Sequence, residues 1–500
     1  MAQIIHRTGH VTPRLNPVIH RFIHRPGPDR DRPHCGRTIL RPQSDSPFRT
    51  GENNSCLEGD LQMATAGTTR SSVLLRVLGW IARRLVGDRA EALSFGGNLS
   101  MLPDRSLFPL FRDGLDPVPA VGSLRERSPV SRLPVPLGIR AWLVTGYEPV
   151  RAVLGSADGF SNDFGRFAAR IGLTAAQEPG GLGMTDPPMH TRLRRLVTPE
   201  FTMHRLARLQ PRIDVIVAER LEAMARISGP VDLWQDFALP VPTLTICELL
   251  GVPYADRESV QRFSTARFDL GDGAYAPLDA INESRAYLLD LVGRQRRDPG
   301  DGLIGSLIRD HGDELDDREL AGLADGVLTG GLETSASMLA LGALVLMTQP
   351  ELADPLRAGE PADALVEELL RYLTVVQVAF PRFAVRDMEV AGVPIKAGDV
   401  VMCSLSAADR DGVLGPGMDR IEIGRPTSRS HLAFGHGLHR CVGAELARME
   451  LRTAYPALVR RFPAMRPAVD PASLSMRRSS IVFGLDSLPV TLGPAASPSE

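Results

Sequence analysis

A glycine-rich turn around a single cysteine, followed by a helical pattern, constrains this chain more than any other feature. It is the stretch 431–450, HLAFGHGLHRCVGAELARME, with Cys441 in the turn. A helix starting after Gly443 places the cysteine sulfur near the positive end of a helix dipole and near free backbone N–H groups, which favours the thiolate. Glycines also let the backbone approach a flat group closely. On these residues alone, a buried free cysteine in a turn is the commoner alternative.

The spacing of four residues in this stretch favours the first interpretation. Phe434, Gly437, Cys441 and Gly443 complete the pattern Phe-x-x-Gly-x-x-x-Cys-x-Gly, which resembles the haem-binding loop of the cytochrome P450 family. The resemblance implies that Cys441 is the axial ligand of a haem iron, the metal site of the chain. It also implies that Phe434 and Gly435 lie against the haem and that His439 binds a propionate.

A basic pair upstream fits the same cofactor. Asp186 and the two prolines after it signal a helix start, so His190 and Arg194, four residues apart, share one helix face. An exposed basic face is the simpler interpretation of the pair in isolation. The sequence resembles the propionate-binding helix of the P450 family, however, and Arg382 falls where that family places another propionate-binding arginine.

The most informative helix is predicted over about residues 317–349. Gly330 and Gly331 lie at its centre, each costing about 1 kcal/mol relative to alanine, and the Thr334 hydroxyl can bond back to the Gly330 carbonyl and bend the helix. Helix–helix packing at small residues would also account for the glycines. Residues 330–334 nevertheless resemble the oxygen-activation motif of the P450 family, which implies proton relay by Thr334 and Glu333.

A further helix, predicted over residues 361–372, contains Glu368 and Arg371 at a spacing that allows an ion pair. Glu-x-x-Arg arises by chance in many helices, and an exposed pair contributes little stability. The resemblance requires this pair upstream of the cysteine loop, where it is found. If the pair is buried, we expect it to specify the scaffold.

Composition excludes several classes of protein. The net charge of −2 argues against a general nucleic-acid binder. The five cysteines form no CxxC pair, which argues against a zinc site or a disulfide framework and fits a reducing cytoplasm. A run of about 18 apolar residues is absent from the sequence, so integral membrane contact is not expected.

The chain divides into three predicted parts. Residues 1–62 are rich in Arg, His and Pro and lack periodicity, which predicts disorder; alternatively, translation begins at Met63. Residues 63–94 predict an amphipathic lead-in helix, with weak membrane contact as a lesser alternative. Residues 95–495 resemble one P450 haem domain, which implies a single triangular domain, mainly α with a small β region.

The resemblance implies a monooxygenase that holds haem b and inserts one oxygen atom of O2 into a small hydrophobic compound or secondary metabolite. Electrons would come from NAD(P)H through a separate ferredoxin and its reductase. Arginines 192, 195, 440 and 448 are docking candidates, although solvated arginines explain them equally well. Two alternatives are a peroxide-using haem-thiolate peroxygenase, disfavoured by the intact Glu333–Thr334 pair, and a non-catalytic P450-like recruitment module, disfavoured by Cys441.

Substrate contacts are expected from apolar residues that family topology places over the haem. They are Leu328, Leu332, Val376, Val378, Ile481 and Val482.

Overall fold

Helix α13, Asp317–Thr348, is the longest helix of the described chain and lies at the centre of the helical region. The computed structural model describes residues 104–495, except 136–138, 164–181, 267–274, 427–428 and 478–479. The predicted extension 1–62 and the lead-in helix 63–94 lie outside the described residues. A capping box starts α13, because the Asp316 carboxylate accepts the Glu319 N–H at 2.8 Å and Glu319 accepts the Asp316 N–H at 3.3 Å.

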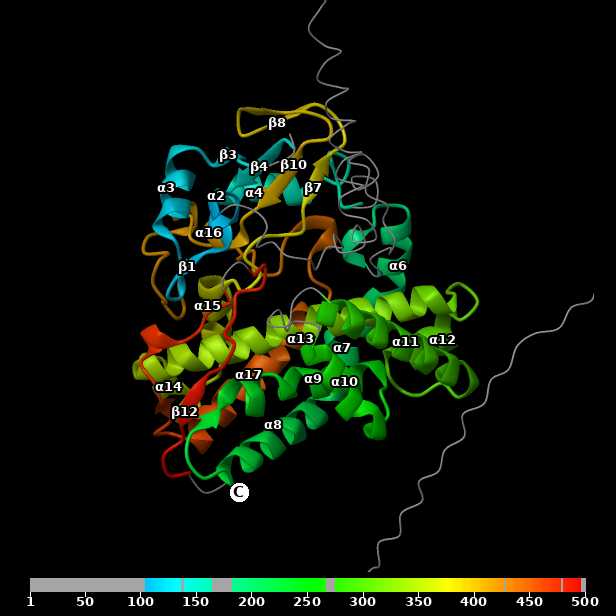
Figure 1. Cartoon of the computed structure of the whole chain (residues 1–500), viewed down its shortest axis with the longest axis vertical. Helices are drawn as coiled ribbons and strands as arrows, with labels where there is room; N and C mark the ends of the chain where they lie inside the picture. Colours follow the sequence, from blue (N-terminus) through cyan, green and yellow to red (C-terminus); the bar gives the residue numbers. More distant parts are fainter. Residues whose placement is uncertain are drawn as a thin grey trace, which may run out of the picture. The chain divides into compact units, whose positions relative to one another are not determined.

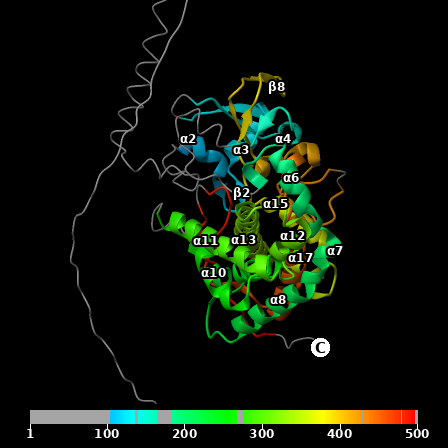
Figure 2. The ribbon, with the colours of Figure 1, turned by 90° about the vertical axis from the view of Figure 1, so that its right-hand side faces the viewer.

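The helices that surround α13 are amphipathic or wholly buried, and Figure 2 shows α13 among α10, α11, α12 and α17. The longer helices are α3 Pro119–Arg127, α4 Tyr147–Gly155, α6 Met189–Val197, α8 Gln210–Ala225, α9 Pro240–Leu250, α10 Arg257–Ala266, α11 Tyr275–Arg297, α12 Leu303–His311, α14 Pro350–Arg357, α15 Asp363–Leu373 and α17 Ala444–Arg461. The short helices are α2 Asp104–Leu107, α7 Met203–Leu206, α16 Leu405–Ala408, the 3-10 turn η10 Gly437–His439 and the π-helical turn η7 Trp234–Ala238.

The β structure is small, and its largest sheet, with β3, β4, β7 and β10, lies apart from the helices around α13, whereas β12 lies among them (Figure 1). The largest sheet has the strand order β3-β4-β10-β7-β5, in which β10 pairs with β4 in parallel and the remaining pairs are antiparallel. Its strands are β3 Val130–Leu133, β4 Ala141–Val144, β5 Phe160–Ser161, β7 Arg382–Ala384 and β10 Val400–Cys403. The remaining strands are β1 Arg112–Asp113, β2 Asp116–Pro117, β6 Val231–Asp232, β8 Met388–Val390, β9 Val393–Ile395, β11 Arg466–Pro467 and β12 Pro489–Thr491.

The hydrophobic core lies mainly between α13 and its neighbours. Within the described residues, α13 is the helix whose length and apolarity would suffice to cross a membrane, but 78% of its most apolar window is buried inside the protein. Its apolar character therefore reflects a core helix contacted on several sides. The packing is tight around Gly342 of α13. A side chain at this position would collide with Tyr455, whose hydroxyl donates to the Met338 carbonyl at 2.5 Å.

Candidate active site

The cysteine loop has the turn that the sequence predicts. Gly435 and Gly437 both have a left-handed backbone, at φ +69° and +71°. A Cβ at Gly437 would also lie 2.3 Å from the Leu154 carbonyl oxygen at the end of α4, so this position excludes any larger residue. The backbone N–H of Cys441 donates to the Phe434 carbonyl at 2.9 Å, which closes the loop.

Cys441 directly precedes α17 and is exposed. Protein atoms nevertheless surround it closely enough that burial raises the pKa of the thiol, against the opposing effects of the Gly443 backbone N–H and of nearby arginines, first Arg194. The other two cysteines of the described chain, Cys247 and Cys403, are fully buried, and burial raises the pKa of each thiol to about 12. Only Cys441 among the described cysteines is placed to bind a ligand.

The structure brings together the basic residues that the sequence singled out. His190 on α6 lies against His439 of η10, with their ring centroids 4.2 Å apart. Arg382 begins β7 and is 5% exposed, and Arg194 lies one turn after His190 on α6. We call these four residues the basic cluster.

The basic cluster keeps buried nitrogens without hydrogen-bond partners, although the Asp186 carboxylate lies close enough to oppose part of its charge. Both ring nitrogens of His190, which is fully buried, and Nη1 of Arg382 lack a hydrogen-bond partner. Burial, and then the neighbouring Arg382 and His190, lower the pKa of His439 to about 3. Burial also lowers the pKa of His190, Arg194 and Arg382. An anion would supply the missing acceptors, so the cluster fits the two propionates of a haem.

Helix α13 presents two different glycines at its centre. A Cβ on Gly331 would lie 2.6 Å from Ile246 of α9, so Gly331 serves helix packing. Gly330 is exposed, and a Cβ there would meet nothing within 4 Å. The Thr334 hydroxyl donates to the Gly330 carbonyl at 2.7 Å, which is the back-bonding that the sequence predicts. Gly331 thus follows the packing explanation and the back-bond to Gly330 is as predicted, while a role of this turn in oxygen activation stays a prediction.

Glu333 is buried and paired, which the sequence did not indicate. Its Oε1 accepts a hydrogen bond from Nη1 of Arg477 at 2.8 Å. Arg477 also pairs with Asp486 at 3.3 Å and stacks over Trp234 at 4.5 Å. Burial, only partly offset by Arg477, raises the pKa of Glu333 to about 7. The carboxyl can therefore gain or lose a proton near neutral pH.

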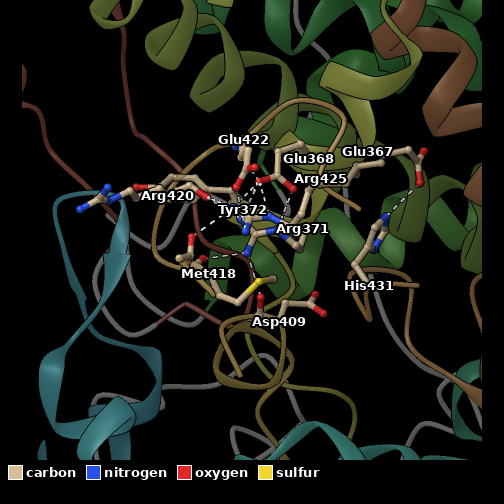
Figure 3. Close-up of polar contacts among 12 residues, drawn as sticks. Glu367, Glu368, Arg371, Tyr372, Asp409, Met418, Arg420, Glu422, Arg425 and His431 are labelled. Carbon is tan, nitrogen blue, oxygen red and sulfur yellow. Dashed lines mark hydrogen bonds and ion pairs between the residues drawn. The ribbon is translucent and has the colours of Figure 1, made fainter. Parts of the chain in front are cut away.

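The Glu368–Arg371 pair is buried and fully connected (Figure 3). The two side chains form a bidentate contact, with both N–O distances 2.8 Å. Arg371 also donates to the carbonyls of Asp409, Met418 and Arg420, each at 2.9 Å. The pair thus ties α15 to the segment that leads into the cysteine loop.

The predicted substrate contacts fit only in part. Leu328, Leu332 and Val378 do not fit, because they are buried in the core at 1–3% exposure and offer no surface to a ligand. In the central part of α13, residues 326–334, accessible surface is found instead at Gly326, Val327, Thr329, Gly330, Gly331 and Thr334. By contrast, Val376 and Val482 are half-buried and face each other in a β-bridge, and Ile481 is also half-buried.

The docking candidates also differ from expectation. Arg448 is 9% exposed and binds both oxygens of Glu367, at 2.5 and 3.0 Å, so it is not available on the surface. Arg192 and Arg195 of α6 pair with Glu319 and Glu314. Arg440 is exposed. The four arginines therefore do not form one free patch.

Comparison with known proteins identifies the family. The family model described as Cytochrome P450 matches residues 362–489. The chain is 42% identical to "Cytochrome P450 FAS1" of Rhodococcoides fascians, covering 76% of this chain and 97% of the relative. It is 41% identical to "Mycinamicin IV hydroxylase/epoxidase" of Micromonospora griseorubida, over 74% and 94% of the two chains. A solved structure of OxyE, a cytochrome P450 involved in teicoplanin biosynthesis, matches with a TM-score of 0.70 at 39% identity, over 77% of this chain and 99% of that one. The chain therefore belongs to the cytochrome P450 family of haem-dependent monooxygenases.

Proposed function

We propose that this P450 inserts one oxygen atom of O2 into a secondary metabolite, with electrons delivered from NAD(P)H by a separate ferredoxin and its reductase. The observation that carries the proposal is an accessible Cys441 next to Arg194 of the basic cluster, in which His190 and Arg382 keep buried nitrogens without partners. The open turn of α13 at Gly330 and Thr334 supports it further. The relatives named for mycinamicin and teicoplanin chemistry support a natural-product substrate.

Each residue of the candidate site has a proposed role. Cys441 would ligate the haem iron, and His190, Arg194, Arg382 and His439 would hold the propionates, with Phe434 and Gly435 against the haem. Thiolate-ligated haem supplies the binding of O2 and the cleavage of its O–O bond. The remaining task for the protein is to deliver protons and to orient the substrate.

Proton delivery is assigned to α13. Because the Thr334 hydroxyl donates its proton to the Gly330 carbonyl, its oxygen lone pairs remain free to accept a hydrogen bond on the open side of the turn. Glu333 is adjacent, and with a pKa of about 7 it can take up a proton from solvent and release it inward. Arg477 holds the carboxyl in place. Val376, Ile481 and Val482 remain candidates for orienting an apolar substrate.

Turnover with a reconstituted ferredoxin system tests the proposal. Wild-type protein should consume NAD(P)H and O2 and form hydroxylated or epoxidised product from a compound that perturbs the haem spectrum. Thr334→Ala should bind the same compound but release most of the consumed oxygen as hydrogen peroxide. Full coupling in Thr334→Ala would refute the relay. Turnover with peroxide alone, and none with ferredoxin, would identify a peroxygenase.

A further inference from the structure

The arginine that the sequence placed in a docking patch is instead a buried side chain at the centre of a polar cluster next to the cysteine loop. Arg448 lies on α17, two turns after Cys441. Its guanidinium makes a bidentate contact with Glu367 and a second ion pair with Glu445, at 2.7 Å. Three charge-assisted hydrogen bonds of this kind fix the plane of the guanidinium.

The same cluster surrounds the ring of Phe434. The Arg448 guanidinium carbon lies 4.7 Å from the centroid of that ring, and the His431 ring lies 5.8 Å from it in a tilted arrangement. His431 in turn contacts Glu367, with Nε2 3.2 Å from Oε2 (Figure 3). Phe434 is therefore held between a cation and an imidazole that share one carboxylate.

The backbone of Phe434 is hydrogen-bonded to the backbone of the cysteine. Its carbonyl accepts the backbone N–H of Cys441 at 2.9 Å. The positive charge of Arg448 also acts on the Cys441 sulfur, as do the charges of Arg194 and Arg440. Arg448 thus influences the sulfur in two ways: it positions Phe434, and its own positive charge acts on the sulfur.

We propose that Arg448, anchored by Glu367, is a positioning residue that fixes Phe434 beside the Cys441 ligand and sets the reduction potential of the haem iron. The inference rests on the proposed ligation by Cys441. A cation near the thiolate stabilises the more negatively charged, reduced centre, whereas the Glu367 carboxylate opposes it. Because Arg448 is buried, solvent screens its charge little, whereas the side chain of Glu367 is 41% exposed and its charge is screened more.

The test is potentiometric titration of the haem-loaded protein without substrate or redox partner, so that no turnover is required. Arg448→Met removes the cation and keeps an apolar stem against Phe434. It should favour the ferric form about tenfold, which is about 59 mV more negative for a one-electron couple. Arg448→Lys keeps the positive charge but cannot make the bidentate contact with Glu367. It should shift the potential by less than half as much as Arg448→Met.

Two further variants separate this effect from general damage. Arg452→Met removes an arginine one turn later on α17, where it pairs with Asp363 and is partly exposed, and it should leave the potential unchanged. Glu367→Gln removes the opposing carboxylate and should shift the potential in the positive direction. If Arg448→Met does not retain haem, the direction of the potential shift in Glu367→Gln tests the proposal instead.

The inference is overturned if Arg448→Met and Arg452→Met shift the potential equally, if Arg448→Met loads haem without any shift, or if Glu367→Gln shifts it negatively. A wild-type protein without a thiolate-type carbon monoxide spectrum would instead overturn the proposed ligation.

Discussion

Two groups of buried charges flank the cysteine loop, and they differ in how completely they are paired. Around Glu368 and Arg371, each carboxylate oxygen and each guanidinium nitrogen has a partner, including three backbone carbonyls. In the basic cluster, His190 and Arg382 keep buried nitrogens without any acceptor. A buried ion network that is complete specifies a scaffold, whereas a mainly basic cluster with unpartnered nitrogens is suited to bind an external anion.

The largest effect is expected from breaking the complete network. Arg371→Met leaves the buried Glu368 carboxylate without its main partner and should reduce the free energy of unfolding by about 3–5 kcal/mol. Urea denaturation monitored by circular dichroism measures this. Arg357→Met is the matched control, because Arg357 makes the same i,i+3 contact with an aspartate that is 71% exposed; it should cost less than about 1 kcal/mol. Equal losses in the two variants would remove the distinction.

Removing a charge from the basic cluster should not destabilise the haem-free protein. Arg382→Met removes an unsatisfied buried cation, so the haem-free protein should keep its stability or gain about 1 kcal/mol. The same variant should lose haem faster to an excess of apomyoglobin, because one propionate loses its partner. Arg386→Met is the control, since Arg386 is exposed and pairs only weakly, with Asp158 at 3.5 Å. A haem-free Arg382→Met protein as unstable as Arg371→Met would mean that the cluster is structural.

A buried acid extends the comparison with a pH-dependent effect. Glu450 of α17 is 1% exposed, its Oε1 has no partner, and burial raises its pKa to about 8 despite contacts with Ser335 and Thr245. An unfolded glutamate titrates near pH 4.3. The folded protein thus binds the extra proton, and the resulting stability is fully present below about pH 4 and is lost as the pH rises toward 8.

Glu450→Gln should therefore flatten the fall in unfolding free energy between pH 5 and 8, a range that denaturant titrations cover. The exposed Glu351→Gln on α14 should leave that slope unchanged. An unchanged slope in Glu450→Gln would show that the carboxyl is not protonated in the fold.

The sequence predicted much of this arrangement where function depends on local spacing. The turn around Cys441, the helix with Gly330 and Thr334, and the Glu368–Arg371 pair are all set by residues within a few positions of one another. The structure also brings His190, Arg194, Arg382 and His439 together, as expected, although their roles as propionate ligands remain a proposal.

What the sequence did not predict depends on packing between distant segments. Helix α13 is apolar on nearly all sides, so periodicity could not show that Leu328 and Leu332 face the core while Gly330 faces open space. Likewise, Arg477 and Glu333 are 144 residues apart, and nothing local indicates that they pair. Arg448 looked like a surface arginine because its partner Glu367 lies on a different helix.

The most direct test of the account is the absorption spectrum of the reduced protein under carbon monoxide. We expect wild-type protein and Cys403→Ala, which lacks a buried cysteine of β10, to show the Soret band of thiolate-ligated haem, and Cys441→Ala to lose it. A wild-type protein that binds no haem, or that shows the spectrum of nitrogen ligation in its native state, would contradict the central claim.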